Sequence, residues 1–387
     1  MGSPDPLDFY AVGALLSDDE RLVRDTVARF VDREVTPIIA ECFAAERFPV
    51  ELVPRLAELG LFGATIRGYG CAGLGYTAYG LICEELERGD SSVRSCVSVQ
   101  SSLVMGAIHQ FGSEEQRSHW LPELARGAKL GCFALTESHG GSDPARMRTR
   151  ARRHGGDWTL DGAKHWITNG ALADVAVVWA MTDDGVNAFL VERGASGFES
   201  RVIKNKMSLR ASSTAELAFT DVRVPERARL PEANGLKAAL QCLDEARFGI
   251  AWGACGAARD CIDTALRYTE SRELFGRPLN QTQLIQTRLA DAVRKLAGAQ
   301  LVAWRLAQLK ERGAAMNAQV SLAKWSNVRA ALDIARDCRD MLGAAGIMLD
   351  HSPMRHMLNL ETVITYEGTQ SIHELIVGRA LTGQSAF

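Results

Sequence analysis

Residues 365–383 read T-Y-E-G-T-Q-S-I-H-E-L-I-V-G-R-A-L-T-G and place Glu367 in a turn that precedes a helical pattern. Apolar residues recur at helical spacing after the turn, at Ile372, Leu375, Ile376 and Ala380. Thr369 or Ser371 can cap this helix, so Glu367 lies beside backbone N–H groups that have no partner in the helix. A carboxylate next to such donors can act as a general base beside an oxyanion site. The alternative is a solvated glutamate in an ordinary helix-entry turn.

The composition is that of a globular protein. The chain has 387 residues, of which 47% are hydrophobic, and this suffices for one large domain or two to three ordinary domains. A net charge of −3 gives no reason to expect nucleic acid or an anionic membrane as a partner. The nine cysteines are scattered without a C-x-x-C pair, and the eight histidines show no clustered ligand pattern. We therefore expect no metal site and a reducing compartment.

The first ten residues are polar and acidic, without a basic segment or a long apolar run. No later stretch approaches 18 uncharged apolar residues, so no membrane span is predicted. These features favour a cytoplasmic protein. A processed form in an organellar matrix is the alternative.

The N-terminal third is predicted to be mostly helical. Ser17 and Glu20 form a capping-box pattern, and Ser113 offers a second cap with Gln116. Helical patterns follow at residues 22–31, 50–59, 74–88 and 91–110. We take residues 1–130 as an N-terminal α-helical domain.

Residues 68–73 match the G-x-G-x-x-G pattern of dinucleotide-binding loops. Such a loop requires a strand before it and repeated βαβ units after it. Here a helical segment that stops at Gly60 precedes the match, and further helical segments follow. We interpret it as a glycine-rich turn between helices, with a dinucleotide site as the less favoured alternative.

The pattern changes to strands over residues 131–232, which we predict to be a small β domain. Residues 158–160 and 164–168 flank Asp161-Gly162, which predicts a hairpin with its turn at that dipeptide. Short β-rich runs follow at residues 175–180, 188–191 and 215–224. Helical periodicity returns at residues 234–271, 281–312 and 316–342, so residues 233–387 are predicted to form a four-helix bundle.

The stretch at residues 365–383 resembles the C-terminal signature of acyl-CoA dehydrogenases, most of all glutaryl-CoA dehydrogenases, and the predicted order α, β, α is that of the family's fold. The resemblance extends over roughly residues 15–387. It implies an α+β fold with an N-terminal helical domain, a middle β-barrel-like domain and a C-terminal four-helix bundle. Oxidation of an acyl thioester requires a hydride acceptor that no side chain can supply. The resemblance implies that this acceptor is FAD.

Two motifs carry the flavin prediction. Residues 133–137 with 141–144 look like the family's L-T-E…G-S-D loop, and residues 166–168 look like its W-I-T element. The alternative is a hairpin with aromatic core residues. The resemblance implies a flavin site that includes Phe133, Leu135, Thr136, Gly141, Ser142, Trp166, Ile167, Thr168, Asp340, Leu342, Gly343, Ala344, Thr369, Ser371 and Phe387.

Two further features concern the flavin. Arg272, Phe275 and Gln283 resemble an element that reaches the FAD of a neighbouring subunit, so the resemblance implies a homotetramer. The alternative for Arg272 is a solvated charge at a helix end. Ala344 stands where the family has glycine in L-G-G-N-G, which puts the affinity for FAD in question.

Arg94 is the residue that bears on the substrate. It lies four residues before Ser98 on a predicted helix and has only uncharged neighbours. An unpaired buried charge is costly, so Arg94 requires either a substrate anion or an internal acid such as Glu87. The resemblance implies that Arg94 binds the distal carboxylate of glutaryl-CoA. It extends the acyl-CoA site to Glu87, Ser95, Ser98, Ser142, Arg247, Tyr366 and Gly368.

Together these features predict FAD-dependent oxidative decarboxylation of glutaryl-CoA to crotonyl-CoA and CO2. The resemblance implies that Glu367 removes the α proton, that hydride passes to flavin N5, and that electron-transfer flavoprotein accepts the electrons. One alternative is the oxidation of another acidic acyl thioester, bound to CoA or to a carrier protein, with or without decarboxylation. A flavin-free helical interaction protein is the other.

Overall fold

Helices make up the chain from Asp18 to Ala125 in the computed structural model, which describes residues 6–385. The two predicted capping boxes form, since the Ser17 and Ser113 side chains accept the N–H groups of Glu20 and Gln116 at 3.2 Å each. The helices are α1 (Asp18–Phe30), α2 (Thr36–Ala44), α3 (Val53–Glu58), α4 (Tyr76–Gly89), α5 (Ser91–Ser98), α6 (Gly106–Phe111) and α7 (Glu114–Ala125).

The glycine-rich segment at residues 68–73 is a turn between α3 and α4. Gly68, Gly70 and Gly73 adopt positive φ angles there, and the first strand begins only at Gly131. The absence of a preceding strand in the described residues confirms the prediction of a turn and argues against a dinucleotide-binding loop.

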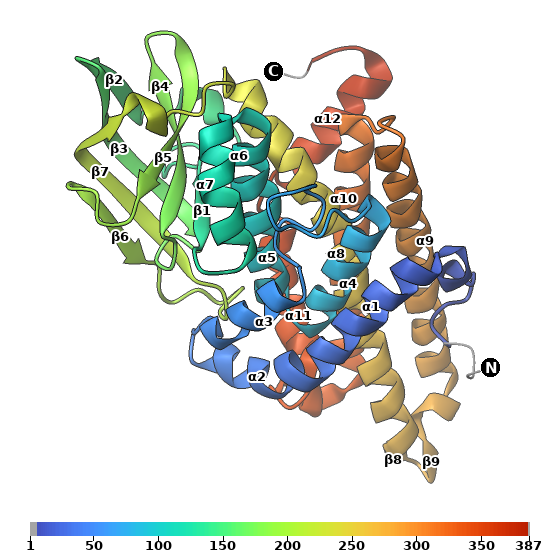
Figure 1. Cartoon of the computed structure of the whole chain (residues 1–387). Coiled ribbons are helices and arrows are strands. Elements are labelled where there is room, and N and C mark those ends of the chain that lie inside the picture. The colour runs from blue at the N-terminus through green and yellow to red at the C-terminus, as the bar shows by residue number, and fades with distance from the viewer. Residues whose placement is uncertain (1–5, 386–387) are drawn as a thin grey trace.

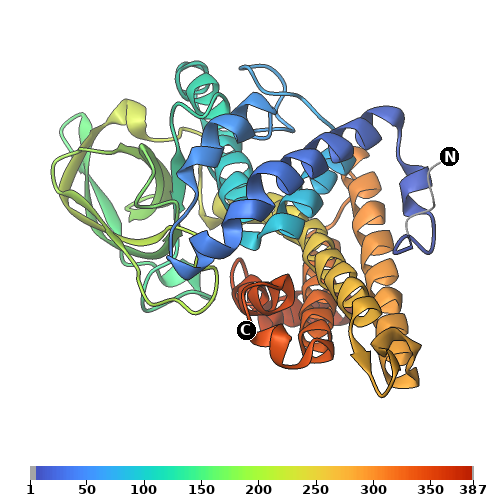
Figure 2. The same ribbon diagram turned by 90° about the horizontal axis from the view of Figure 1, so that it is seen from below.

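A curled sheet follows the helices and lies beside them (Figures 1 and 2). Its strand order is β1-β4-β2-β3-β7-β6, and β5 pairs with β4. The strands are β1 (Gly131–Ala134), β2 (Arg150–His154), β3 (Asp157–Thr168), β4 (Val175–Thr182), β5 (Gly185–Glu192), β6 (Phe198–Val202) and β7 (Thr214–Pro225). Apolar residues of these strands form a core of their own within the sheet.

The predicted hairpin turn at Asp161-Gly162 is wrong. These two residues lie inside β3, and the turn falls at Gly155-Gly156, where His154 pairs with Asp157. Gly162 instead marks a register shift of β3 against β7 and has a φ of 145°. A Cβ atom at Gly162 would lie 2.6 Å from the Cα atom of Thr149, so the glycine serves a close backbone approach.

The C-terminal part is helical again. Its helices are α8 (Leu236–Ser271), α9 (Gln283–Glu311), α10 (Asn317–Met341), α11 (Ser352–Val363) and α12 (Gln370–Thr382), and the hairpin of β8 (Glu273–Leu274) and β9 (Arg277–Pro278) joins α8 to α9. Asn327 of α10 donates to the carbonyls of Ala251 and Ala299 at 3.0 and 2.9 Å, which ties three helices together. The predicted order of a helical part, a β part and a second helical part is therefore observed.

The N-terminal and C-terminal helices share one hydrophobic core, because α4 packs along α8. Within residues 6–385 no helix combines the length and apolar character that crossing a membrane requires. Secondary structure changes from helix to strand between Ala125 and Gly131, and back to helix between Pro225 and Leu236.

Candidate active site

Glu367 lies in the loop between α11 and α12, which we call the base loop (residues 364–369). Glu367 and Gly368 have φ angles of 53° and 99°, so the chain turns sharply here. Of the two predicted caps, Thr369 acts, because its hydroxyl accepts the N–H of Ile372 at 3.3 Å, whereas Ser371 is exposed. The predicted helix-entry turn is therefore confirmed.

Two buried cations hold the carbonyl groups of the base loop. Lys324 of α10 donates from Nζ to the carbonyls of Tyr366 and Gly368, at 2.6 and 2.7 Å. Arg247 of α8 donates from Nε to the carbonyl of Glu367 at 2.8 Å. Lys324 is only 1% exposed and Arg247 is 5% exposed. Three consecutive carbonyls are thus bound from two helices, and neither cation was recognised in that role from sequence.

The surroundings of Glu367 keep its carboxylate available as a base. Its Oε2 atom is buried and has no hydrogen-bond partner among the described residues. Burial raises the pKa of Glu367, while Arg94, Lys324 and Arg247 counteract this rise. Burial also lowers the pKa of Lys324 to about 7 and, with the nearby cations, the pKa of His373 to about 3. His373 is therefore neutral, and the positive charge around Glu367 comes from the other three side chains.

Arg94 is completely buried on α5 and is only partly paired. Its Nε donates to Glu87 Oε2 at 2.5 Å, and its Nη2 donates to the Tyr366 hydroxyl. The other Glu87 oxygen accepts from the Ser91 hydroxyl at 2.9 Å. Nη1 of Arg94 and Oγ of Ser98, both buried, have no partner within residues 6–385. The internal pairing with Glu87 is present, and it leaves one donor of the guanidinium unused.

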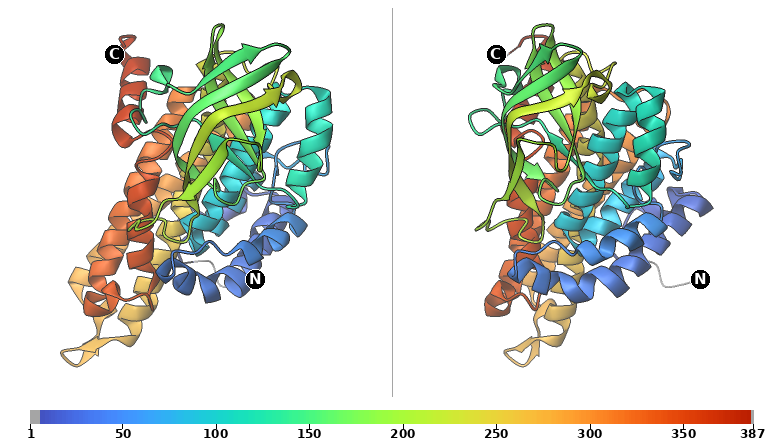
Figure 3. Two further views of the ribbon diagram at one scale, coloured as in Figure 1. Left: turned by 90° about the vertical axis from the view of Figure 1, so that its left-hand side faces the viewer. Right: turned by 60° about the vertical axis from the view of Figure 1, so that its left-hand side comes forward.

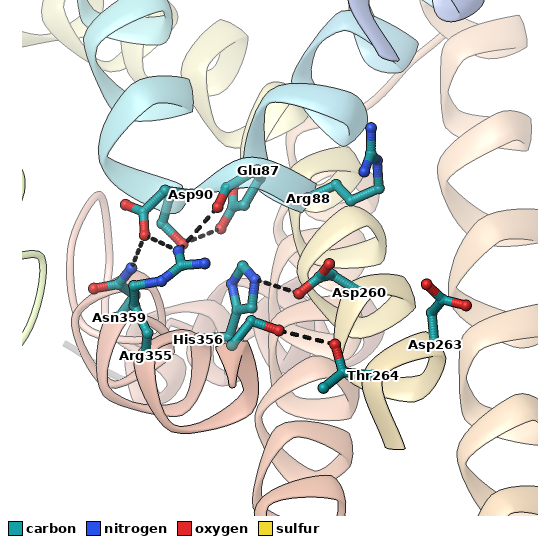
Figure 4. A network of polar contacts seen from close by, with 12 residues as sticks. Glu87, Arg88, Asp90, Asp260, Asp263, Thr264, Arg355, His356 and Asn359 are labelled. Atoms are coloured by element: carbon teal, nitrogen blue, oxygen red, sulfur yellow. Dashed lines mark hydrogen bonds and ion pairs between the residues drawn. The ribbon is translucent and has the colours of Figure 1, made fainter. Parts of the chain in front are cut away.

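A second buried network fixes the start of α5 (Figure 4). Asp90 caps this helix by accepting the N–H of Ser92 at 2.7 Å. Its other oxygen accepts from Arg355 and, at 2.8 Å, from Asn359, both on α11. The helix that carries Arg94 is thereby joined to the helix that leads into the base loop. Sequence reasoning missed this network, although the N-cap aspartate was a visible local signal.

The predicted flavin residues of the β domain lie where the edge strand β1 ends and its continuation meets β3, since the His165 N–H donates to the Thr136 carbonyl at 2.8 Å. Phe133, Leu135 and Ile167 are buried, Thr136 and Thr168 are half-buried, and Gly141 and Ser142 are exposed on the loop after β1. Trp166 lies at a register shift in β3, has a φ of 61°, and leaves 56% of its surface exposed.

Glu137 anchors this loop, a role that the sequence analysis did not assign. Its carboxylate accepts the N–H groups of Arg148 and Thr149 at 2.6 and 2.9 Å, and the ammonium of Lys164 at 2.9 Å. Burial opposes ionisation, yet these donors lower the pKa of Glu137 to about 2. Burial lowers the pKa of Lys164 to about 8 despite its partner. Glu137 therefore stays ionised and holds the backbone behind the exposed loop.

The residues predicted to serve a neighbouring subunit lie away from the base loop. Arg272, Phe275 and Gln283 are exposed around the β8–β9 hairpin, at the end of the helices remote from the sheet (Figures 1 and 3). Phe275 is 99% exposed and has a φ of 53°. Within one chain this hairpin and the edge of the sheet do not meet.

The loop at residues 340–346 departs from the family without strain. Asp340 accepts from Arg288 at 2.5 Å, Leu342 is buried, Gly343 has a φ of 59°, and Ala344 is exposed. A Cβ atom at Gly346 would lie 2.0 Å from the Arg339 carbonyl oxygen. The chain keeps glycine at the two positions where the backbone requires it. Phe387, also predicted to bind the flavin, lies outside the described residues.

Comparison with known proteins identifies the family. Models of the N-terminal, middle and C-terminal domains of acyl-CoA dehydrogenases match residues 17–128, 132–222 and 233–382. The chain belongs to the acyl-CoA dehydrogenase family. The short-chain specific acyl-CoA dehydrogenase of Bos taurus mitochondria is 38% identical over 94% of this chain and 90% of its own length.

Solved structures agree with this assignment. A glutaryl-CoA dehydrogenase from Mycobacterium smegmatis in complex with FADH2 is 52% identical, with a TM-score of 0.98 over 99% of both chains. Butyryl-CoA dehydrogenase from Megasphaera elsdenii is 32% identical, with a TM-score of 0.91 over 95% of this chain and 98% of its own. This acyl-CoA dehydrogenase is accordingly an FAD-dependent oxidoreductase, as the sequence predicted.

The residues at the edge of the sheet fit FAD. The exposed indole of Trp166 offers a flat apolar face, and the hydroxyls of Thr136, Ser142 and Thr168 supply polar groups around it. The Nδ2 atom of Asn169 is buried beside Thr168 in sequence and has no partner in the described part of the chain. An aromatic face among hydroxyl and amide donors suits a planar ring with polar edges.

The predicted acyl-CoA residues fall into two groups. Those buried or half-buried on α4, α5, α8 and the base loop are Glu87, Arg94, Ser95, Ser98, Arg247, Tyr366 and Gly368. Ser142 lies apart from them on the exposed loop after β1. Arg247 binds Asp244 at 2.9 Å and the Glu367 carbonyl, so its contacts within the chain support the base loop.

Proposed function

We propose that this protein oxidises and decarboxylates glutaryl-CoA to crotonyl-CoA and CO2. The observation that carries the proposal is the unused pair of donors on α5, Nη1 of Arg94 and Oγ of Ser98. Both atoms are buried, and they lie four residues apart on one face of the helix. A carboxylate at the far end of an acyl chain would satisfy both donors at once.

An uncharged acyl chain would leave these donors without a partner. Buried polar groups without hydrogen bonds are destabilising, and the penalty is larger for a charged group. Glu87 compensates the charge of Arg94 through Nε but does not reach Nη1. The pocket therefore discriminates in favour of an acidic acyl group. Two solved structures of glutaryl-CoA dehydrogenase from Mycobacterium smegmatis, 52% and 54% identical to this chain, support the same substrate.

The proposed chemistry uses the base loop and α5 together. The Glu367 carboxylate takes the α proton, and its backbone N–H stabilises the enolate oxygen. Bound FAD supplies the acceptor for the hydride that leaves the β carbon. Arg94 holds the distal carboxylate while its C–C bond breaks and CO2 departs, and the bonding electron pair enters the conjugated thioester. A proton returned to the γ carbon then completes crotonyl-CoA.

The proposal extends to partner proteins. We propose that electron-transfer flavoprotein accepts the electrons from reduced FAD, in keeping with the family. We further propose a homotetramer, in which the exposed Arg272, Phe275 and Gln283 of one subunit complete the FAD site of another. The exposure of these three side chains in the single chain supports this assignment.

A second candidate is a dehydrogenase of short uncharged acyl-CoA that releases no CO2. The 33–38% identity to short-chain specific acyl-CoA dehydrogenases favours it. The third is oxidation of another acidic acyl thioester, on CoA or on a carrier protein. The unpaired Nη1 of Arg94 supports this substrate equally, because it too carries a distal acid. It differs from glutaryl-CoA in the length of the acyl chain.

Anaerobic bleaching of the bound flavin separates these candidates. We expect glutaryl-CoA to bleach the flavin much faster than butyryl-CoA at equal concentration. Mass spectrometry of the acyl product should then show crotonyl-CoA rather than glutaconyl-CoA, with one CO2 released per flavin reduced. Faster bleaching by butyryl-CoA would favour the short-chain candidate, and accumulation of the unsaturated acid would refute decarboxylation.

A further inference from the structure

Lys324 is a buried lysine whose ammonium binds backbone carbonyls of the base loop instead of a carboxylate. It is 1% exposed, and within residues 6–385 no carboxylate oxygen lies within 4.0 Å of its Nζ. Its hydrogen bonds go to the carbonyls on either side of Glu367, at 2.6 and 2.7 Å. A buried ammonium without a paired acid is costly, so a structural role alone would be served better by a neutral donor.

We infer that Lys324 is a positioning residue for Glu367, which both orients the peptide groups of the base loop and holds the carboxylate in its ionised form. This role rests on the proposed function of Glu367 as the base that removes the α proton. It therefore does not depend on whether the substrate is glutaryl-CoA or an uncharged acyl-CoA.

The orientation follows from peptide geometry. In a planar trans peptide the C=O and N–H groups point in opposite directions. Because Lys324 draws the Tyr366 carbonyl toward α10, the N–H of Glu367 points away from α10, toward the side on which an oxyanion can be bound. Glu367 also holds a left-handed φ of 53°, which non-glycine residues adopt only when their surroundings impose it. The paired carbonyl contacts of Lys324 are such a constraint.

Charged groups act on Lys324 from three elements. Glu367 lies on the base loop, Arg247 on α8 and Arg94 on α5, and these three act electrostatically on the ammonium. From α12 the buried His373 contributes no charge, because its pKa is near 3. The acid nearest Arg247, Asp244, is already bound to it and to Asn317. Among the described residues, Glu367 is thus the one acid that acts on Lys324 electrostatically, and the ammonium, present below the Lys324 pKa of about 7, favours the ionised carboxylate.

Two substitutions separate orientation from charge. Lys324→Gln removes the charge but keeps N–H donors for the carbonyls, although its side chain is one bond shorter. Lys324→Met removes both charge and donors at similar length. The matched control is Lys310→Met on α9, where a mostly buried lysine binds Glu245 at 2.7 Å and, within residues 6–385, makes no hydrogen bond or ion pair with the base loop.

The first readout requires no oxidation. Acetoacetyl-CoA has an acidic α carbon, so a base can form its enolate at the site, and the bound enolate is followed by its ultraviolet absorption as pH is varied. The second readout is the pH dependence of flavin reduction by the substrate. FAD content and melting temperature are measured on the same samples.

In both Lys324 variants we expect the pH midpoint of enolate formation to rise by about one unit or more, because a neighbouring positive charge typically shifts a carboxyl pKa by about 1–3 units. We expect flavin reduction to slow by roughly ten- to hundred-fold in Lys324→Met and by less in Lys324→Gln, since misplacement by about 1 Å can cost about 10²-fold. Lys310→Met should keep the wild-type midpoint and rate.

An unchanged midpoint in Lys324→Gln would overturn the charge role, and equal rates in the two Lys324 variants would overturn the orientation role. A midpoint shift of the same size in Lys310→Met would overturn both. If Lys324→Met does not retain FAD, the midpoint of Lys324→Gln decides the inference alone.

Discussion

The base loop and the β8–β9 hairpin differ in burial: side chains of the same chain enclose the base loop, whereas the hairpin is exposed. The base loop is enclosed by one chain, because Lys324, Arg247 and Arg94 reach it from α10, α8 and α5 and are each 5% exposed or less. The hairpin exposes Phe275 almost fully and leaves Arg272 in solvent. One chain therefore encloses Glu367 on its own, whereas the exposed residues of the hairpin have little to pack against in the described part of the same chain.

This difference separates two kinds of functional residue. A buried charge such as Arg94 must have a partner in the folded state, so its unused donor indicates a ligand. An exposed charge such as Arg272 is satisfied by water, so its role depends on an assembly that one chain does not contain. Substitutions in the first region should alter chemistry and specificity, whereas those in the second should alter assembly and FAD binding.

The largest effect is expected at the centre of the enclosed region. Glu367→Gln keeps the shape of the side chain but cannot accept a proton, so flavin reduction should fall by about 10²–10⁴-fold or more while FAD stays bound. Stopped-flow absorbance measures the reduction. The control is Glu361→Gln on α11, which breaks an exposed ion pair with Arg336 and should leave the rate unchanged. Near-normal reduction in Glu367→Gln would place the base elsewhere.

The pH dependence of the wild-type enzyme follows from the same carboxylate. Burial raises the pKa of Glu367, so the base is lost by protonation as pH falls through that raised value. Flavin reduction should therefore decline at a pH above the ordinary range of a glutamate. A decline only near the ordinary glutamate pKa would mean that the carboxylate is solvated, as the alternative from sequence held.

Arg94→Gln is expected to have the next largest effect, and a selective one. Truncating one partner of a buried charge pair costs about 2–5 kcal/mol, which corresponds to roughly 30- to several-thousand-fold in kcat/KM. Glutaryl-CoA should suffer this loss, whereas butyryl-CoA never formed the pair and should change little. The control is Arg88→Gln on α4, which removes an arginine that binds Glu85 and Asp32.

Steady-state kinetics with both substrates, alongside thermal melting, measures the Arg94 effect. Equal losses for the two substrates with a lowered melting point would mean that Arg94 serves only its internal partners Glu87 and Tyr366. The substrate assignment would then move to the uncharged short-chain candidate.

The exposed hairpin should respond through FAD and not through folding. If Arg272 donates to the FAD of a neighbouring subunit, Arg272→Gln removes a charged hydrogen bond worth about 1.5–3 kcal/mol, or roughly ten- to hundred-fold in FAD affinity. FAD titration and light scattering measure affinity and assembly. Arg267→Gln, which breaks an exposed ion pair with Asp263 near the end of α8, is the control. A monomer with full FAD occupancy and activity would contradict the subunit-sharing proposal.

Local sequence signals predicted most of the fold. The capping boxes at Ser17 and Ser113 located two helix starts, and helical periodicity located α8, α9 and α10. The hairpin turn predicted at Asp161-Gly162 was wrong because Gly162 allows a close approach to Thr149. The sequence does not distinguish a glycine with this role from a glycine in a turn. The residue that decides between the two roles, Thr149, lies more than ten positions before Gly162 and is therefore outside a local turn pattern.

The candidate site likewise contains residues that a short stretch of sequence points to and residues that it does not. The family resemblance of two short stretches predicted roles for Glu367 and Arg94, and both residues lie in one buried region of the structure. Lys324 escaped notice, since it meets the base loop across 42 and 44 residues of sequence. The Asp90–Arg355 pair spans 265 residues and likewise leaves no local signal. Partners brought together only by packing are thus the part that sequence reasoning could not supply.

The smallest effect is expected at Ala344, where the sequence raised doubt about FAD. The side chain is exposed in a short helical turn, Gly343–Ile347, and the glycines that the backbone needs flank it at positions 343 and 346. Restoring glycine removes one methyl group and adds backbone freedom to the unfolded chain. Ala344→Gly should therefore lower the free energy of unfolding by about 0.5–1 kcal/mol.

The same substitution should change FAD affinity by less than about threefold, because a methyl group that points into solvent displaces no contact. Gly346→Ala is the informative counterpart: its Cβ would lie 2.0 Å from the Arg339 carbonyl oxygen, so the loop would have to move. We expect a loss of about 1–3 kcal/mol in stability for that variant, as for other overpacked sites. Fluorescence titration with FAD and chemical denaturation measure both variants. A large gain in FAD affinity in Ala344→Gly would show that the departure from the family weakens the cofactor site, and that the loop meets FAD through this methyl group.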